Sequence, residues 1–217
     1  ALMPTGNTGN AFSIDHAGDL HVNAPLNFEA LNTYTLSVIV TSGNGASANG
    51  TVTVNVVNLN DPPAATDAVF TLPENAAVSA IVGSVVATDQ DTAGANSTRQ
   101  YAITQGDFDN RFGINPTTGQ ITVIAPLDYE KIGVHVFHVT VSDGGSPPLS
   151  DTAQVTVNVT DVNEEPLMDD EVFTVQEDAP IGAYIGTMQA IDFDFGSSIT
   201  YSINPADNVG NAFSIHP

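Results

Sequence analysis

Residues 135–141, with the sequence His-Val-Phe-His-Val-Thr-Val, indicate the fold of this chain. Phe137, Val139 and Val141 occupy every second position and form one row of side chains. Alternation with a period of two is typical of a β-strand with one buried face. Three further stretches alternate in the same way: Tyr34/Leu36/Val38/Val40, Val52/Val54/Val56 and Val155/Val157/Val159. No stretch has a convincing helical period, so the sequence predicts an all-β protein.

Turn-forming residues separate the predicted strands. Ser-Gly-Asn-Gly occupies residues 42–45, Pro-Thr-Thr-Gly residues 116–119 and Asp-Gly-Gly residues 143–145. About seven short strands in roughly 100 residues are typical of an antiparallel β-sandwich. A unit of that size buries enough apolar surface to fold without covalent cross-links.

Four sequence blocks recur in the same order, at offsets of 100 to 103 residues. The blocks are Asn10–Ile14 with Asn110–Ile114 and Asn211–Ile215, Ala24–Glu29 with Ala125–Glu130, Asn58–Pro62 with Asp161–Pro166, and Phe70–Asn75 with Phe173–Asp178. Such recurrence predicts tandem structural units. We expect residues 62–163 to form one complete repeat, residues 1–61 the later part of a preceding repeat, and residues 164–217 the early part of a following one.

The chain of 217 residues carries 3 Lys and Arg residues against 25 Asp and Glu residues, a formal net charge of −22. So few cations cannot neutralise a row of phosphates, so we expect no nucleic-acid partner. A basic membrane-binding surface is excluded for the same reason, and no apolar run reaches the ~18–20 residues that span a bilayer. Cysteine is absent, which excludes disulfides and thiolate metal sites. The acidic excess indicates either a solvated surface or carboxylates that hold divalent cations.

The acidic residues of the complete repeat lie near its ends and turns. Asp89/Asp91, Asp128/Glu130 and Asp161/Asn163 are pairs two residues apart, so each pair shares one side of an extended backbone. A hard cation takes six to eight oxygens at roughly 2.3–2.6 Å, several of them charged. Without a cation, carboxylates this close together repel one another. Any single pair is better explained as carboxylates that cap a loop and keep the surface soluble, but the whole recurring set favours a metal site.

Five motifs in order resemble the cadherin repeat, and the resemblance covers essentially the whole chain. The motifs are Pro73-Glu74-Asn75, Ala87-Thr88-Asp89-Gln90-Asp91, Leu127-Asp128-Tyr129-Glu130, Val141-Ser142-Asp143-Gly144-Gly145 and Asp161-Val162-Asn163-Glu164. The resemblance implies tandem seven-stranded Greek-key β-sandwiches of the cadherin and immunoglobulin-like kind. It also implies calcium as the bound ion, with up to three ions at each junction between repeats.

Carried over by the resemblance, the metal ligands fall into two junctions. The second junction, between residues 62–163 and 164–217, would use Glu74, Asp128, Glu130, Asp161, Asn163, Glu164, Asp192 and Asp194. The first junction, between residues 1–61 and 62–163, would use Glu29, Asn60, Asp61, Asp89, Asp91 and Asp143. Asn27 and Asn58 stand where the family has Asp, so we expect fewer or looser ions at the first junction. Glu164 also replaces a usual Asp, with a longer side chain that still ligates.

The leading hypothesis is a calcium-stiffened extracellular segment of a large cell-surface protein, secreted or outer-membrane associated, that acts as a spacer or in adhesion. Its expected partners are calcium ions, neighbouring repeats of the same protein, and a homophilic or polysaccharide partner. The low cation count and the Asn- and Thr-rich strands resemble repeats of bacterial surface proteins. We expect no enzyme activity, because the five His residues form no catalytic or zinc group and no HExxH motif is present.

Two alternatives stay open from the sequence. The segment could be a carbohydrate- or matrix-binding module, with Tyr129, Phe193 and Phe195 as candidate aromatic platform residues. Separately, the two partial repeats are complementary, so two chains could complete each other's sandwich by a head-to-tail exchange.

Overall fold

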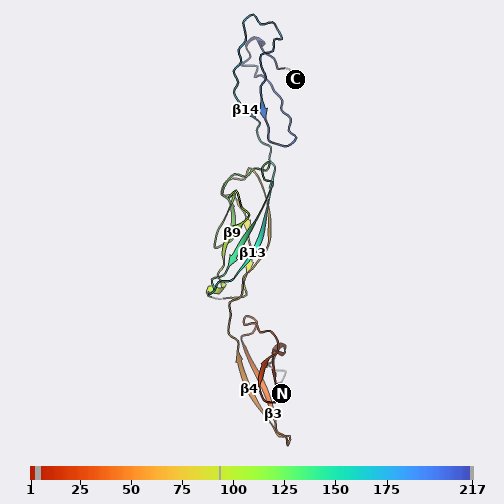
Figure 1. Ribbon diagram of the computed structural model, residues 1–217, viewed down its shortest axis with the longest axis vertical. Coiled ribbons are helices and arrows are strands. Elements are labelled where there is room, and N and C mark those ends of the chain that lie inside the picture. Colours follow the sequence, from red (N-terminus) through yellow and green to blue (C-terminus); the bar gives the residue numbers. More distant parts are fainter. Residues whose placement is uncertain (3–5, 93, 216–217) are drawn as a thin grey trace.

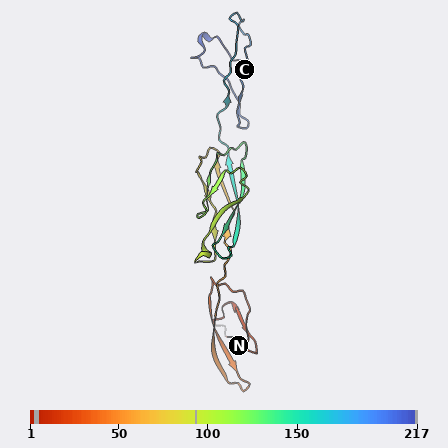
Figure 2. The same ribbon diagram turned by 60° about the vertical axis from the view of Figure 1, so that its left-hand side comes forward.

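The computed structural model describes residues 1–2, 6–92 and 94–215. The chain is elongated, with three lobes arranged end to end (Figures 1 and 2). The N-terminal lobe contains β3 and β4, the central lobe contains β9 and β13, and the C-terminal lobe contains β14 (Figure 1). Among the described residues, no helix is long and apolar enough to cross a membrane. The elements are almost all strands, as the alternating sequence predicts.

The central lobe is a sandwich of two sheets. One sheet has the strand order β6-β13-β12-β9 and the other the order β10-β11-β7, and a short pair β5-β8 accompanies them. The strands are β5 (Ala64–Ala65), β6 (Ala68–Pro73), β7 (Ile81–Ser84), β8 (Ala87–Thr88), β9 (Gln100–Gln105), β10 (Phe112–Ile114), β11 (Gln120–Val123), β12 (Val134–Ser142) and β13 (Ser150–Thr160), with the 3-10 turn η2 (Ala95–Ser97) between β8 and β9. The prediction of a β-sandwich is confirmed. One pair differs from the predicted antiparallel pairing, because β6 runs parallel to β13.

The core of the central lobe follows the alternation seen in the sequence. Phe137, Val139 and Val141 on β12 are fully buried, as are Val155 and Val157 on β13. They pack with Ile121 and Val123 of the second sheet and with Val85, which directly follows β7. Burying one such side chain contributes roughly 1.5–3 kcal/mol. This core therefore fixes the ends of β6, β12 and β13 relative to one another.

The N-terminal lobe is less completely packed. It contains η1 (Thr8–Asn10), β1 (Phe12–Ile14), β2 (Leu20–Val22), β3 (Thr33–Thr41) and β4 (Ser47–Asn55), which form the pairs β1-β2 and β3-β4. Its buried core is Ala11, Phe12, Tyr34 and Leu36, with the Phe12 ring edge-on to Tyr34 at 5.0 Å. The expectation that Val40 and Val52 lie in a buried row is wrong, because they are 66% and 39% exposed. Within the described residues, β3 and β4 form a two-stranded sheet that leaves these positions uncovered.

The C-terminal lobe has little regular structure. Its elements are β14 (Leu167–Met168), which pairs with β15 (Ala190–Ile191), and η3 (Val209–Asn211). Apolar side chains, including Phe173, Tyr201 and Phe213, line a cavity of about 760 Å³.

One turn has the same geometry in all three lobes. The side chains of Asn7, Asp107 and Asn208 each accept a hydrogen bond from the N–H of the Phe five residues later, at 2.9, 3.1 and 3.1 Å. Two residues before each Phe, an Asn has a φ of 51° or 52°. This left-handed conformation suits Asn better than most residues. The recurring sequence blocks therefore encode a recurring local structure.

Replacing Phe137 by Ala in the central core is expected to lower the free energy of unfolding by about 3–5 kcal/mol, because a fully buried aromatic ring leaves a cavity. Chemical denaturation followed by circular dichroism measures the change. Val136→Ala is the matched control, since Val136 directly precedes Phe137 on β12 and is 43% exposed. This control should lower the free energy of unfolding by less than about 1 kcal/mol. Equal losses in the two variants would contradict the assignment of the buried face.

Candidate metal centre

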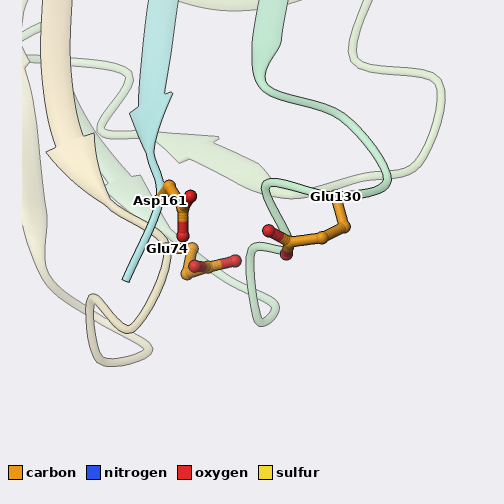
Figure 3. Close-up of side chains that lie close together, drawn as sticks. All are labelled: Glu74, Glu130 and Asp161. Carbon is orange, nitrogen blue, oxygen red and sulfur yellow. The ribbon is translucent and has the colours of Figure 1, made fainter. Parts of the chain in front are cut away.

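Three carboxylates meet where two parallel strands end. The β6–β13 register pairs Pro73 with Thr160, so the next residues, Glu74 and Asp161, leave the sheet side by side. Glu130 reaches the same point from the loop that leads into β12, and Figure 3 shows the three side chains directed toward one another. One carboxylate oxygen from each of the three lies within 4.8 Å of the others. Parallel pairing of β6 with β13 thus creates the site.

Glu74 is the fixed member of this group. Its carboxylate is buried and accepts a hydrogen bond from the Tyr129 N–H on Oε2 and one from the Val162 N–H on Oε1, both at 2.7 Å. These two bonds attach both the loop that carries Glu130 and the segment that follows Asp161 to the Glu74 carboxylate. Each oxygen of Glu74 keeps acceptor capacity, because a carboxylate offers about four lone-pair sites.

Carboxylates from the linker and the C-terminal lobe extend the group. The Glu164 N–H donates to Asp194 Oδ2 at 2.8 Å, and the Asp194 N–H donates to Asp192 Oδ1 at 3.0 Å. The Asn163 amide donates instead to the backbone carbonyl of Glu164 at 3.1 Å. The Asp128 Oδ1 accepts the Lys131 N–H at 2.8 Å, which shapes the loop on the central lobe.

Loss of solvation, together with mutual repulsion, raises the pKa values of these groups. Burial raises the pKa of Glu130, and the charges of Glu74, Asp161 and Glu164 raise it further. Burial also raises the pKa of Asp161, with added contributions from Asp194 and Glu74. The pKa of Glu164 is raised by burial and then by Glu74, Asp194, Asp128 and Asp161. The structure therefore brings Glu74, Asp128, Glu130, Asp161, Glu164 and Asp194 close enough to interact, and Asp192 and Asn163 join them through hydrogen bonds with Asp194 and Glu164.

At the first junction, Asp91 is the carboxylate that receives the linker. It is buried, and its Oδ2 accepts the Asp61 N–H at 2.9 Å. Its Oδ1 accepts the side-chain amide of Asn58 at 3.1 Å. The Asp91 N–H in turn donates to Asp89 Oδ1 at 3.0 Å.

Asp143 is the second buried carboxylate of the first junction. Its Oδ1 accepts the N–H groups of Gly145 and Leu149 at 2.9 Å, and its Oδ2 accepts the Asn60 amide at 2.8 Å. Burial raises the pKa of Asp143, but these hydrogen bonds outweigh it and hold the pKa below its ordinary value. Gly145 permits the contact, because a Cβ there would clash with the Asn60 amide.

Two buried oxygens of the first junction lack a hydrogen-bond partner among the described residues. They are Asn60 Oδ1 and Asp89 Oδ2. Burial raises the pKa of Asp89, and the charges of Asp91 and Asp143 contribute in the same direction. Buried oxygens without donors are costly, and a hard cation would satisfy them. The donor set of both junctions, oxygen atoms alone, fits calcium.

Glu29 is the predicted ligand that the structure does not connect to the others. Within the described part of the chain, it makes no hydrogen bond or ion pair to another predicted ligand. The neighbouring Asn27 reaches across the junction instead, and its amide donates to Gln90 Oε1 at 2.9 Å. Sequence reasoning missed Gln90, although it stands between the predicted ligands Asp89 and Asp91.

His135 lies in the core, as its place in the alternating row predicts. It is buried edge-on to Phe112 at 5.1 Å, and its Nδ1 lies 3.8 Å from Asp109 Oδ1. Burial lowers the pKa of His135, while the charge of Asp109 raises it. This packing explains the residue without a catalytic role.

Comparisons with known proteins agree with the structure. The Cadherin domain family matches residues 68–160. The chain is 36% identical over 221 residues to "Cadherin EGF LAG seven-pass G-type receptor 3" of Mus musculus, covering 97% of this chain and 7% of that protein. It is 34% identical over 214 residues to "Protocadherin-like wing polarity protein stan" of Drosophila melanogaster, covering 94% of this chain and 6% of that protein.

A solved structure has the same fold. "Crystal structure of human CDH23 EC21-23" superposes with a TM-score of 0.66 at 28% identity, covering 89% of this chain and 64% of that chain. These relatives are animal proteins, so the expected likeness to bacterial surface proteins gains no support. The chain spans only a small part of the relatives' length. With its central lobe matched as a cadherin domain and its whole length similar to cadherin-repeat proteins, the chain belongs to the cadherin family.

Proposed function

We propose that this chain is an extracellular segment of tandem cadherin repeats that calcium ions stiffen at the junctions between repeats. The observation that carries the proposal is the meeting of Glu74, Glu130 and Asp161, with ligand oxygens within 4.8 Å of one another. Three ionised carboxylates at this distance repel, and a divalent cation between them converts the repulsion into attraction. Glu74 and Glu130 come from the central lobe, and Asp161 directly follows β13 at the start of the linker.

The mechanism rests on which parts of the chain carry the ligands. Glu74 and Glu130 belong to the central lobe, Asp161 and Glu164 to the linker, and Asp194 to the C-terminal lobe. A cation bound by all three parts would restrict the angle between the lobes. Bound calcium would supply the positive charge, and the positions of these carboxylates would determine which parts of the chain it holds together. The second junction would then behave as a rigid joint.

We further propose the division expected from the sequence, with 1–61, 62–163 and 164–217 as parts of three successive repeats. The segment would serve adhesion or act as a spacer at a cell surface, with neighbouring repeats and calcium as its first partners. The names of the relatives include receptors, cadherins and protocadherins, which supports a surface role rather than an enzyme. Head-to-tail exchange between two chains stays a prediction, which a monomeric mass in solution would contradict.

The carbohydrate-binding alternative has weaker support. Tyr129, Phe193 and Phe195 line an open cavity of about 670 Å³, and Phe195 is fully exposed. Exposed aromatic rings favour sugar binding, but the relatives are cadherins and protocadherins, and their names indicate no carbohydrate ligand. The calcium proposal accounts for the neighbouring carboxylates, and the carbohydrate hypothesis does not.

Calcium is expected to raise the melting temperature and to narrow the range of shapes in solution, because it removes repulsion at the second junction. Differential scanning calorimetry and small-angle X-ray scattering, each in calcium and in EGTA, measure these two effects. The chelator should shorten the average particle and reverse the gain in melting temperature. Identical melting and scattering in the two conditions would rule out the proposal.

Glu130→Gln is expected to weaken calcium binding at least about tenfold, because it removes one unit of ligand charge while keeping one carbonyl oxygen. The free energy of unfolding in EGTA should not fall, since Glu130 is exposed and repels Glu74 and Asp161. Isothermal titration calorimetry measures the affinity. Glu171→Gln removes the same charge from an exposed position outside the carboxylate group, and it should leave the affinity unchanged.

Acid is expected to weaken calcium binding at the second junction. In EGTA, where no calcium is bound, acid is expected to stabilise the folded second junction. The pKa values of Glu130, Asp161 and Glu164 are raised in the folded chain. Their repulsion is therefore fully present above these raised values and is lost as the pH falls through them toward the values of the unfolded chain. Protons then compete with calcium for the same oxygens. Calorimetry in buffers of different ionisation heat should detect proton release, and an affinity independent of pH across this range would contradict the assignment.

A further inference from the structure

The turn before β10 carries charged side chains in the central lobe and not in the two neighbouring lobes. Residues 107–111 read Asp-Phe-Asp-Asn-Arg, whereas the matching residues read Asn-Thr-Gly-Asn-Ala at 7–11 and Asn-Val-Gly-Asn-Ala at 208–212. All three segments form the same hydrogen-bonded turn before a Phe. Asp109 and Arg111 therefore stand where both other lobes have Gly and Ala, and the turn forms without their charges.

His135 is a second departure, and it lies beside the same turn. Its ring is edge-on to Phe112, with ring centroids 5.1 Å apart and an angle of 80° between the rings. In the N-terminal lobe, Tyr34 is edge-on to Phe12 at 5.0 Å and the same angle. Tyr34 and His135 both pair with a Val on the next strand, so they occupy equivalent positions. The position requires a ring, and the central lobe places there the one ring that titrates near neutral pH.

The charged groups that face His135 all come from this turn. They are Asp109, Asp107 and Arg111, and the residue paired with His135 on β13 is the apolar Val157. Asp109 Oδ1 lies 3.8 Å from His135 Nδ1, and Asp109 Oδ2 accepts the Arg111 Nε–H at 2.8 Å. The Asp107 carboxylate accepts two backbone N–H groups, at 2.9 and 3.1 Å. Both carboxylates thus already have other donors.

The environment of His135 suits a neutral ring. The side chain is buried, and its Nε2 has no hydrogen-bond partner among the described residues. We assign the proton of the neutral ring to Nδ1, the nitrogen that faces Asp109, which leaves Nε2 as a lone pair. A second proton would place an N–H donor without an acceptor, and a positive charge, inside the core. Both are costly to bury.

This cost determines how acid acts on the central lobe. Burial lowers the pKa of His135 and Arg111 acts in the same direction, while Asp109 and Asp107 raise the pKa without cancelling the effect of burial. In an unfolded chain the pKa of His is about 6.5. The neutral ring therefore stabilises the fold fully above about pH 6.5, and this stability is lost as the pH falls through that value toward the lowered pKa of the folded chain.

The cluster lies where the loop that carries Glu130 joins the central lobe. Arg111 donates to the backbone carbonyl of Pro126, at the beginning of this loop. At the other end of the loop, β12 begins at Val134, and His135 is its second residue. A change at His135 would therefore act on the base of this loop.

We propose that His135 is an acid-sensitive switch of the central lobe, and that its protonation loosens the start of β12. In neutral solution the ring fills the place that Tyr34 fills in the N-terminal lobe. In mildly acidic solution the charged ring favours open states in which it reaches water, and the turn at 107–111 separates from β12. The inference needs no bound metal and does not depend on the proposed function.

NMR titration of the wild-type chain tests the protonation directly. The Cε1–H resonance of His135, identified by its loss in His135→Tyr, should titrate below the ordinary His value of about 6.5. The measurement is made in calcium-free buffer with EGTA. A pKa at or above 6.5 for this resonance would overturn the inference.

Hydrogen exchange at pH 7.5 and pH 5.5, corrected for the intrinsic exchange rate at each pH, tests the loosening. In the wild-type chain, the opening constant of the β12 amides should rise several-fold on acidification, and by no more than about tenfold per pH unit if the open state binds one additional proton. His135→Tyr should abolish this rise, because Tyr does not titrate in this range. His138→Gln is the matched control, since it removes an imidazole from the opposite face of β12 and should keep the rise.

The outcomes are distinct from those that test calcium binding. An equal rise in the wild-type chain and in His135→Tyr, or loss of the rise in His138→Gln, would overturn the inference. Should His135→Tyr fail to fold, His135→Phe removes the same titrating group, and the titration of the wild-type chain still decides. A chain that binds no calcium would contradict the proposed function and leave both of these readouts unchanged.

Discussion

The parallel pairing of β6 with β13 is the constraint on which the candidate metal centre depends. Its register places Pro73 opposite Thr160, so Glu74 and Asp161 emerge together at one end of the central sandwich. Burial then fixes Glu74, which accepts the N–H groups of Tyr129 and Val162 and so attaches two further segments to the same point. A well-packed core behind these strands holds the carboxylates together against their repulsion. The ligand group is therefore a consequence of the fold.

Charge at the junctions is balanced in two different ways. At the second junction, carboxylates from the central lobe, the linker and the C-terminal lobe face one another, and their raised pKa values record the cost. At the first junction, the amides of Asn58 and Asn60 face Asp91 and Asp143 as donors. Asn58 thus places a hydrogen-bond donor at the position where Asp161 places a carboxylate.

Much of this was predictable from the sequence, and the exceptions have physical causes. Alternation identified Phe137, Val139 and Val141 as core, because every second side chain of a strand faces the opposite sheet of the sandwich. It failed at Val40, since alternation states which side chains share a face and not whether another sheet covers that face. The resemblance to the cadherin repeat predicted that Glu74 and Asp161 act together, and the parallel register of β6 and β13 explains why they lie side by side. The amide donors at Asn58 and Asn60 and the contact to Gln90 depend on side-chain directions that spacing does not determine.

The central claim is that calcium binds among Glu74, Glu130 and Asp161 and joins the central lobe to the next repeat. A crystal structure of the chain grown with calcium tests it most directly, with anomalous diffraction to identify the ion. The account predicts calcium within roughly 2.3–2.6 Å of oxygens from all three residues, with linker and following-lobe carboxylates completing the shell. Crystals grown in calcium in which these three carboxylates hold no ion would contradict it.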